Sequence, residues 1–385
     1  MRILYLHQFF ITRAGVGGTR SYEFARRFVR RGHAVRMVTA GGGARTVEGV
    51  EVVGARGGYA DYVRATSVSY PRRMLAFARF ALAATALALR GPRPDVVYAT
   101  SPPLTMALPA LAATARWRVP LVFEVRDLWP EAPIQMGALR HPLARRAARA
   151  VERLVYRHAA RVIALSPGIR AGVVAAGAPG HAVALVPNAA DLDLFAALPR
   201  ERGERFVVSY FGTMGEANDL TAAIEAARLL EDVSFVLMGD GKRRAELERG
   251  APANVFFRGP AGRKEEVAEL AAGSDACLVL FKDVPVLATN SPNKLFDTFA
   301  AGRPAIVNMD GWMRRLVEDN EAGLYVRAGD GRDLAAKVAW LRDHPDEADR
   351  MGRNARALAE REFDRDALAE RALATLEEVA RWPSG

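Results

Sequence analysis

The sequence has little cysteine and histidine. Cys277 is the single cysteine, and six histidines are scattered over 385 residues. One cysteine cannot form an internal disulfide, which excludes a small disulfide-stapled protein. The patterns H-E-x-x-H and G-x-S-x-G are absent, which disfavours the peptidases and hydrolases that carry them. Cys277 lies in the apolar run SDACLVLF, so we interpret it as a buried strand residue rather than a catalytic thiol.

A hydrophobic run long enough to cross a membrane is also missing. The longest apolar stretch, 74–89, has sixteen residues and is interrupted by Arg79, whereas a spanning helix needs about 20. The start, MRILYLHQFF, is a short apolar run that we interpret as a first β-strand rather than a signal peptide. We therefore expect a cytoplasmic location, with peripheral attachment at the inner membrane face left open.

Lysine and acidic residues are scarce in the first half. Residues 1–187 contain 27 arginines, no lysine and 9 acidic residues, a net charge of +18. Residues 188–385 contain 27 basic and 35 acidic residues, a net charge of −8, so the whole chain carries +10. A half this basic favours an anionic partner, which nucleic acid, an acidic lipid surface or a phosphorylated substrate could supply.

Short apolar runs alternate with helical patterns along the whole chain, which predicts α/β architecture with parallel, doubly wound sheets. Expected strands are 3–6, 35–39, 50–53, 96–99, 121–125, 161–165, 206–211, 234–238, 255–257, 276–281 and 304–308. The charged segment ALPRERGERF suggests two domains, 1–187 and 188–363, with a final helix at 364–381. The active cleft should lie between them, at the carboxyl ends of the strands.

A glycine-rich turn, GVGGTR at 15–20, follows the first expected strand and opens a helix. Backbone N–H groups there could approach a phosphate, helped by the helix dipole. The spacing matches neither G-x-G-x-x-G nor the Walker A pattern, so an ordinary strand–helix turn is the alternative. His7 ends the same strand and could face the cleft, while His33 looks structural.

Two further segments place charges at element ends. Lys294 would lie in the first turn of a helix, where a cation opposes the helix dipole unless an anion is bound. Asp297, on the same face, could accept hydrogen bonds from a ribose diol or form a surface ion pair with Lys294. Glu124, Arg126 and Asp127 end a buried strand, where they either pair with one another or contact a polar substrate.

A basic stripe runs along the expected helix 142–158. An apolar helix precedes it in the sequence and carries further arginines. Together they predict either attachment to anionic lipid or an ordinary solvated face. The residues of this membrane or acceptor face are Arg72, Arg73, Arg146, Arg149, Arg153 and Arg157.

The ordered series GVGGTRSYEFARRFVRRGHAV, DVVYATSPP, FEVRDLWP, RVIALSPGIR, VPNAADLDLF, FGTMG, VLMGDGKRRAELE and SPNKLFDTFAAGRPAIV resembles the retaining GT-B glycosyltransferases of the large nucleotide-sugar family four. FEVRDLWPE and NKLFD resemble its bacterial polysaccharide and O-antigen branch, often labelled fucosamine transferases. The resemblance implies two Rossmann-like domains facing across a cleft. The first would bind the acceptor and the second the nucleotide-sugar, and the final helix would cross back onto the first domain.

The resemblance also implies residue roles. Asp297 stands where the last acid of the family's E-x7-E motif contacts the ribose, but the first acid is replaced by Thr289. Arg126 stands where relatives have histidine, followed by Asp127. The loop 212–218 lacks the Arg and Lys of the family, so Lys294 is the preferred diphosphate ligand, ahead of Lys282 and Lys242. The implied donor residues are Gly17, Gly18, Gly212, Gly239, Asn290, Ser291, Pro292, Asn293, Lys294, Leu295 and Asp297, and the catalytic group is Arg126, Asp127, Glu124 and Lys294.

The implied reaction moves a sugar from a nucleoside diphosphate to an acceptor hydroxyl with retention of the anomeric configuration. The first expectation for the donor is UDP, and an N-acetylated amino sugar is the expected sugar. The acceptor would be a saccharide on an isoprenoid diphosphate. We expect no metal and no other cofactor, and we favour front-face attack unless Glu124, Asp127 or Glu131 acts as a nucleophile. Three alternatives stay open: glycosylation of a soluble natural product, a non-hydrolysing sugar-nucleotide epimerase, and nucleic-acid binding by the basic half.

Overall fold

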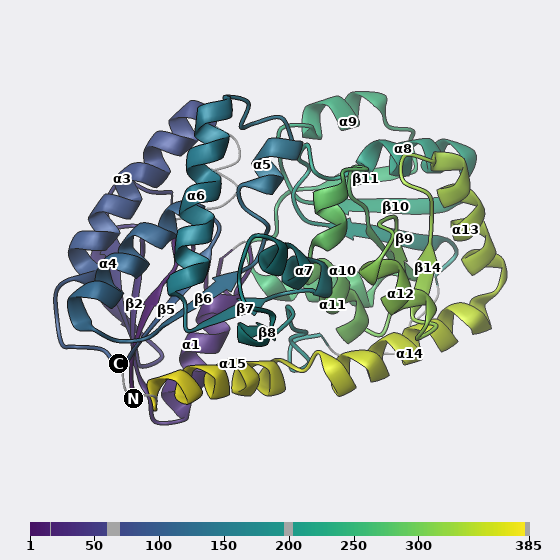
Figure 1. Cartoon of the computed structure of the whole chain (residues 1–385). Helices are drawn as coiled ribbons and strands as arrows, with labels where there is room; N and C mark the ends of the chain where they lie inside the picture. Colours follow the sequence, from purple (N-terminus) through teal and green to yellow (C-terminus); the bar gives the residue numbers. More distant parts are fainter. Residues whose placement is uncertain (16, 60–69, 196–202, 382–385) are drawn as a thin grey trace.

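The computed structural model describes residues 1–15, 17–59, 70–195 and 203–381. Two α/β units lie side by side, each built on its own sheet (Figure 1). The chain passes from the first unit to the second between β8 (Val183–Leu185) and β9 (Phe206–Phe211). Val16 of the glycine-rich turn and residues 196–202 of the charged segment lie outside the described residues.

The first sheet has eight strands in the order β3-β4-β2-β1-β5-β6-β7-β8. Every pairing except β3 with β4 is parallel, as the alternation of apolar runs predicts. Buried apolar strands of this kind need crossover helices on both faces. The remaining strands are β1 (Arg2–Leu6), β2 (Ala34–Ala40), β3 (Gly43–Val47), β4 (Val50–Ala55), β5 (Val96–Ser101), β6 (Leu121–Val125) and β7 (Arg161–Ala164).

The strand β3 was not predicted, and its antiparallel pairing departs from the expected parallel sheet. It forms a hairpin with β4 through Glu48 and Gly49, which have φ angles of 45° and 80°. Four of its five residues are exposed. An exposed edge strand has no apolar alternation from which a sequence pattern could reveal it.

The helices of the first unit cover both faces of its sheet. On one side α3, α4 and α6 lie next to one another, and on the other α1 packs against the C-terminal helix (Figure 1). Ser166 caps α7 by accepting a hydrogen bond from the Ile169 amide, with Pro167 at the first helical position. The bounds are α1 (Arg20–Arg30), α3 (Tyr70–Ala88), α4 (Ala107–Trp117), α5 (Glu131–Gln135), α6 (Pro142–His158) and α7 (Pro167–Ala175).

The second sheet has six parallel strands in the order β11-β10-β9-β12-β13-β14. Cys277 is fully buried in β12, as predicted. The other strands are β10 (Val233–Met238), β11 (Val255–Arg258), β12 (Ala276–Val279), β13 (Ala305–Val307) and β14 (Gly323–Tyr325). The helices are α8 (Leu220–Leu229), α9 (Arg244–Gly250), α10 (Lys264–Ala272), α11 (Asn293–Ala300), α12 (Trp312–Glu318) and α13 (Gly331–Asp343), with the short turn η3 (Pro285–Thr289) before α11.

Two long helices end the chain. α14 (Pro345–Glu362) packs against α11, and α15 (Arg365–Ala380) returns to the first unit, where it contacts α1, β5, β6 and β7. Asp364 caps α15 by accepting from the Ala367 amide, and it forms an isolated bridge with Ala190. One hydrophobic core therefore continues from the first sheet through α15 to one face of the second sheet, while a smaller core covers the other face of the second sheet.

Helices long and apolar enough to span a bilayer do not occur among the described residues.

Candidate functional site

Three segments from both units meet at Gly18. A Cβ atom added to this residue would lie 3.0 Å from Arg126 Nη2 and 3.1 Å from Asn293 Nδ2. Gly18 belongs to the turn after β1, Arg126 follows the carboxyl end of β6, and Asn293 begins α11. Gly17 adopts φ of 133°, close to the Ile11 side chain. The glycine turn thus lets groups of both units approach a common point between them.

Lys294 lies at the same end of α11 without a carboxylate partner among the described residues. Its Nζ donates to the Tyr210 hydroxyl at 3.0 Å and to Asn218 Oδ1 at 3.1 Å. It also lies 4.3 Å from the centre of the Tyr210 ring. Burial lowers the pKa of Lys294 to about 7 because nothing of opposite charge compensates for lost hydration.

The loops after β9 and β10 pack against each other beside Lys294. A Cβ on Gly239 would lie 1.9 Å from the Gly212 carbonyl oxygen, and a Cβ on Gly212 would lie 3.3 Å from Lys294 Nζ. Gly212 and Gly239 have φ angles of 143° and 147°, which L-residues rarely adopt. The Lys294 amine therefore lies directly against the loop after β9. A side chain at Gly212 or Gly239 would collide with this loop or with the lysine.

The start of α11 has no side-chain cap, because Pro292 occupies the cap position. The first N–H groups of an α-helix have no partner within the helix. An anion bound there would accept from them and interact favourably with the dipole. The uncapped helix end and the uncompensated Lys294 amine therefore favour the same kind of ligand.

Arg126 is supported by the buried His7. Arg126 Nη1 lies 3.4 Å from His7 Nε2, and His7 Nδ1 lies 2.9 Å from Ser21 Oγ. Ser21 in turn donates to the Phe9 carbonyl at 3.3 Å. Burial, with the Arg126 charge, holds the pKa of His7 well below its usual range. His7 is only 1% exposed, so it does not face an open cleft, and it contacts Arg126 from the protein interior.

Glu124 does not belong to this group, contrary to the sequence-based expectation. It is fully buried inside the first unit, where Arg20 donates to its carboxylate at 2.8 and 3.0 Å and Tyr98 donates at 2.5 Å. Burial opposes ionisation, but the Arg20 charge outweighs it and lowers the pKa of Glu124. The expected pairing of Arg126 with Glu124 or Asp127 does not form. Asp127 is half-buried, and burial raises its pKa against the opposing effect of Arg126.

Asp297 also differs from expectation. Its side chain is 7% exposed, and its Oδ1 lies 3.1 Å from Lys264 Nζ rather than near Lys294. The predicted surface ion pair between Asp297 and Lys294 therefore does not form. The two side chains extend from α11 in different directions, Asp297 to Lys264 and Lys294 to Tyr210 and Asn218. Burial raises the pKa of Asp297, and the Lys264 charge opposes this shift.

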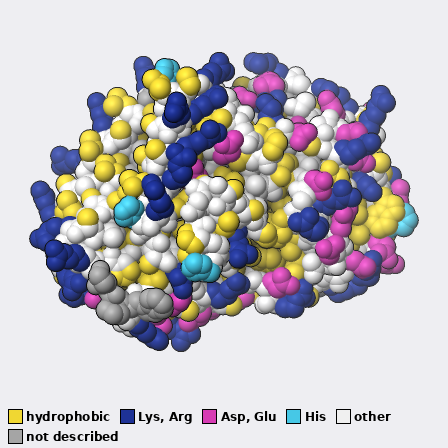
Figure 2. All heavy atoms as spheres, viewed as in Figure 1, with side chains coloured by type: hydrophobic (Ala, Val, Ile, Leu, Met, Phe, Trp, Pro, Cys, Tyr) yellow, Lys and Arg dark blue, Asp and Glu magenta, His cyan; other side chains and the backbone are white. Residues whose placement is uncertain are grey.

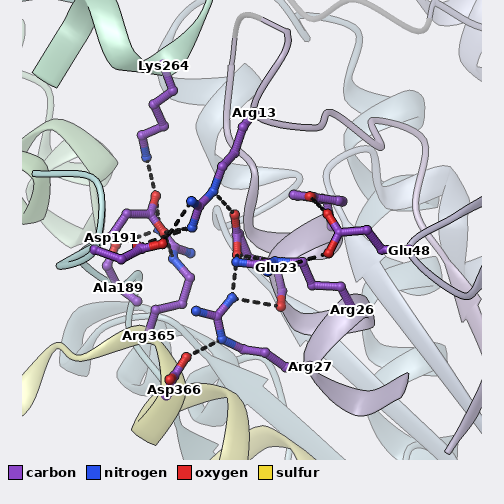
Figure 3. A network of polar contacts seen from close by, with 12 residues as sticks. Arg13, Glu23, Arg26, Arg27, Glu48, Ala189, Asp191, Lys264, Arg365 and Asp366 are labelled. Carbon is purple, nitrogen blue, oxygen red and sulfur yellow. Dashed lines mark hydrogen bonds and ion pairs between the residues drawn. The ribbon is translucent and has the colours of Figure 1, made fainter. Parts of the chain in front are cut away.

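Sequence reasoning overlooked Asp191, which organises the charges around Asp297. Its carboxylate pairs with Lys264 at 2.7 Å and with Arg365 through both oxygens, while Arg13 lies 3.9 Å away (Figure 3). Asp193 pairs with Arg13 at 2.8 Å. The Asp-x-Asp spacing of residues 191–193 could have drawn attention to this segment. Asp191 and Asp193 are therefore paired with lysine and arginine side chains of the protein itself.

The segment before α11 is held by the first unit. Ser166 Oγ donates to the Thr289 carbonyl, and the Val286 amide donates to Gln135 Oε1 at 2.9 Å. A Cβ on Gly168 would lie 3.0 Å from Thr289 Cα. Thr289, which stands where the resemblance implies an acid, is thus a packing residue between the two units.

The other predicted donor-binding residues of the segment before and within α11 differ in burial and in their hydrogen bonds. Asn188 donates from its side chain to the Ser291 carbonyl at 2.5 Å and from its backbone to Ser291 Oγ at 3.1 Å, so Ser291 anchors the segment. Leu295 is fully buried in the core. Asn290 is half-buried near the helix start.

A basic and apolar surface covers α6 and α3 of the first unit. Arg146, Arg149 and Arg153 lie along one exposed face of α6, with Ala147 and Ala150 beside them. Figure 2 shows a run of basic side chains there with hydrophobic side chains beside it. Leu143 on α6 and Leu82 on α3 are 67% and 64% exposed.

The other predicted arginines of this surface vary in exposure. Arg149 pairs with Glu131 at 3.3 Å. Arg72 and Arg157 are exposed, whereas Arg73 is half-buried.

Two family models match most of the chain. Residues 16–189 match a glycosyl transferase 4-like domain, and residues 205–344 match a domain of the glycosyl transferases group 1. No match was found among curated proteins.

Solved structures share the fold over nearly the whole chain. The sucrose-phosphate synthase of Thermosynechococcus elongatus has a TM-score of 0.79 and 17% identity, with 98% of both chains covered. HepE of Anabaena, in complex with UDP-glucose, has a TM-score of 0.71 and 18% identity, covering 98% of this chain and all of HepE. WaaG, a glycosyltransferase involved in lipopolysaccharide biosynthesis, has a TM-score of 0.68 and 16% identity, covering 97% and 99%. The fold is therefore GT-B.

Proposed function

This chain carries the two domains of a GT-B glycosyltransferase, and from that premise we propose that it transfers a sugar from a nucleoside diphosphate to an acceptor hydroxyl with retention. The observation that carries the proposal is Lys294, a buried amine without a carboxylate partner among the described residues. It lies at an uncapped helix end, within reach of Gly212 and one residue from Asn293, which faces Gly18 and Arg126.

The donor diphosphate occupies this junction. As the glycosidic bond breaks, the leaving diphosphate gains negative charge, and Lys294, Arg126 and the α11 amides stabilise it. Loss of one such preorganised donor costs about 3 kcal/mol in an active site. Asp297 contacts the ribose hydroxyls through the part of its carboxylate that Lys264 leaves open. We take UDP as the first nucleotide to test because HepE, which has the same fold, binds UDP-glucose. Among the UDP-sugars, an N-acetylated amino sugar is worth testing beside UDP-glucose, because FEVRDLWPE and NKLFD resemble the fucosamine-transferase branch.

The reaction needs no metal in this proposal. Lys294 and Arg126 provide two positive charges for the diphosphate. The Asp-x-Asp segment, which could otherwise suggest a cation site, directs Asp191 and Asp193 at Lys264, Arg365 and Arg13.

Retention follows from front-face attack, in which a diphosphate oxygen helps to take the acceptor proton. A double displacement would need a carboxylate nucleophile at the sugar. Glu124 is buried in a pair with Arg20, and Glu131 pairs with Arg149. Asp127 is the remaining candidate, because it follows Arg126 directly. Replacing it by asparagine should leave turnover within about tenfold, whereas loss of a nucleophile costs several orders of magnitude.

The acceptor is a saccharide on an isoprenoid diphosphate, reached from an anionic membrane. The arginines and exposed leucines on α6 and α3 support this part of the proposal, since an amphipathic helix with a basic face binds such surfaces. A soluble acceptor is the outcome if the protein does not bind anionic vesicles at low salt.

A thermal-shift panel of UDP-, GDP-, ADP- and dTDP-sugars tests the donor site. A ligand at about 100 times its Kd stabilises the folded state by about 2.7 kcal/mol. We expect one nucleotide to raise the Tm of the wild type and not that of Lys294→Met. Lys282→Met is the matched control, because Lys282 is exposed. The proposal is rejected if no nucleotide shifts the wild type or if Lys294→Met responds equally.

A further inference from the structure

Lys264 is the only described cation paired with Asp297. It is the first residue of α10, and its side chain is 9% exposed. Its Nζ lies between two carboxylates, 2.7 Å from Asp191 Oδ2 and 3.1 Å from Asp297 Oδ1. Its backbone amide donates to the Arg13 carbonyl at 3.2 Å, which ties the start of α10 to the loop after β1. The lysine is therefore held by both units of the fold.

Asp191 does not need Lys264 for its own neutralisation. Arg365 already binds both oxygens of that carboxylate, with Nε on Oδ1 and Nη2 on Oδ2 at 3.1 Å. Arg365 also donates to the Ala189 carbonyl at 2.8 Å, so it is fixed beside Asp191 (Figure 3). Asp297 has no such second cation among the described residues. The charge of Lys264 therefore matters most for Asp297.

We propose that Lys264 is a positioning residue for Asp297, holding Oδ1 of this carboxylate, ionised and fixed, so that its other oxygen accepts hydrogen bonds from the donor ribose. This inference rests on the proposed function and deepens it. Asp297 Oδ1 is fully buried, so the exposed 7% of the side chain belongs to other atoms. A carboxylate has about four acceptor positions. Lys264 occupies one side of it and leaves the remainder for the ribose.

The charge state of Asp297 depends on this contact. Burial raises its pKa, and Lys264 is the largest opposing influence. Among the described residues, the other charged groups that act on Asp297 are Asp191 from the segment after β8 and Arg365 from the start of α15. Without Lys264, the buried carboxyl takes up a proton at higher pH and loses acceptor capacity. The preference of a Lys264 variant for ribose over 2′-deoxyribose should therefore recover as the pH is raised.

The test compares UDP with 2′-deoxy-UDP, or the diphosphate that the panel selects with its 2′-deoxy form, by calorimetric titration. We expect the wild type to bind the ribonucleotide at least tenfold more tightly, and Lys264→Met to bind the two within about twofold at pH 7. The matched control is Arg365→Met, which breaks the same ion network on the far side of Asp191. It should keep the wild-type preference, because the contact between Lys264 and Asp297 remains.

A second variant keeps the test decisive if Lys264→Met does not fold. Asp191→Asn combined with Lys264→Met removes one charge of each sign and leaves Asp297 with Arg365 as the nearest cation. This double variant should also lose the preference for ribose, and raising the pH to 9 should restore part of it. Ribose preference retained in either Lys264 variant overturns the inference, as does a wild type that binds both nucleotides equally. A wild type that binds no nucleotide instead rejects the proposed function itself.

Discussion

Helices α10 and α11 both place a lysine in their first turn, and the two lysines have opposite surroundings. Lys264 lies 2.7 and 3.1 Å from two carboxylates. Burial acts to lower its pKa, but Asp191 and Asp297 outweigh burial and raise it. Among the residues that the structure describes, Lys294 has only the neutral Tyr210 and Asn218 as hydrogen-bond partners, and burial lowers its pKa to about 7. The same residue type in the first turn of a helix is thus satisfied in α10 and unsatisfied in α11.

The difference in counter-charge assigns the two lysines different roles: Lys264 positions Asp297, and Lys294 binds the ligand. A buried cation with its counter-charges in place contributes to a fixed arrangement, and its removal leaves those charges unpaired. A buried cation without counter-charge is costly to the folded protein, so a ligand that brings negative charge gains the most there. Four of the five predictions that follow test this contrast, and the fifth, with the smallest effect, tests the basic surface of α6.

Lys264→Met should lower the free energy of unfolding by about 3–5 kcal/mol, because it leaves Asp191 and Asp297 buried with one fewer cation. Urea denaturation measures this change. Lys282→Met, at an exposed position, should stay within about 0.5 kcal/mol of the wild type. If the Lys264 and Lys282 variants are equally stable, Lys264 does not stabilise the buried carboxylates Asp191 and Asp297.

Lys294→Met should reduce release of UDP from UDP-glucose, or from the donor that the panel selects, by about 100-fold to 1,000-fold, since it removes one stabilising group from the diphosphate. Its unfolding free energy should not fall, because the substitution removes an uncompensated buried charge. Lys242→Met is the control, as Lys242 is exposed and was the weaker candidate for the same role. A destabilised but fully active Lys294→Met would reverse the assignment of the two lysines.

Raising the pH above 7 should weaken binding of UDP-glucose by up to tenfold per pH unit. The diphosphate binds the charged amine, and above its pKa of about 7 the free protein must take up a proton on binding. UDP-glucose suits this titration because its diphosphate has no proton that titrates near neutral pH. Affinity in Lys294→Met should be flat over the same range, and a flat wild-type profile would exclude Lys294 from the diphosphate site.

The ligand-free protein should show the opposite pH trend in stability. The folded-state pKa of Lys294 is lowered below its ordinary value of about 10.4, so between about pH 7 and 10 the unfolded chain binds more protons. The contribution of this residue to stability therefore increases as the pH rises through that window. The urea midpoints of the wild type and of Lys294→Met, compared at pH 7 and pH 9, measure this contribution of Lys294.

The smallest effect concerns α6, where Arg146 and Arg153 have no ion-pair partner among the described residues and Arg149 pairs with Glu131. Arg146→Ala and Arg153→Ala should each weaken binding to vesicles containing phosphatidylglycerol by about fivefold, or about 1 kcal/mol, at low salt. Arg263→Ala, on the second unit, should change nothing. Wild-type protein that stays unbound in a flotation assay would remove the membrane from the proposal and leave a soluble acceptor.

The fold was predictable because its signals are local. Buried strands such as 121–125 and 276–279 appear as short apolar runs, and the helices between them have their own periodicity. The domain models and the solved structures agree with that prediction of paired parallel sheets in the GT-B arrangement. The edge strand β3 escaped because four of its five residues face solvent.

The site was only partly predictable. Lys294 stood out because a cation in a first helical turn is unfavourable, and Gly18 because glycines followed a strand. Glu124 was misassigned to the catalytic group because its partner Arg20 lies 104 positions away, on another element. Asp191 was missed for the same reason, since its partner Lys264 is 73 positions away.

The sequence by itself therefore determined most of the strands and helices, the mainly parallel sheets and the two-domain division, because hydrophobic periodicity acts over neighbouring residues. Only the tertiary structure decided which charges are satisfied. Electrostatic stabilisation depends on distances between side chains from separate elements, and those distances exist only after the two sheets, α10, α11 and α15 have packed together. The contrast between Lys264 and Lys294 is a result of that packing.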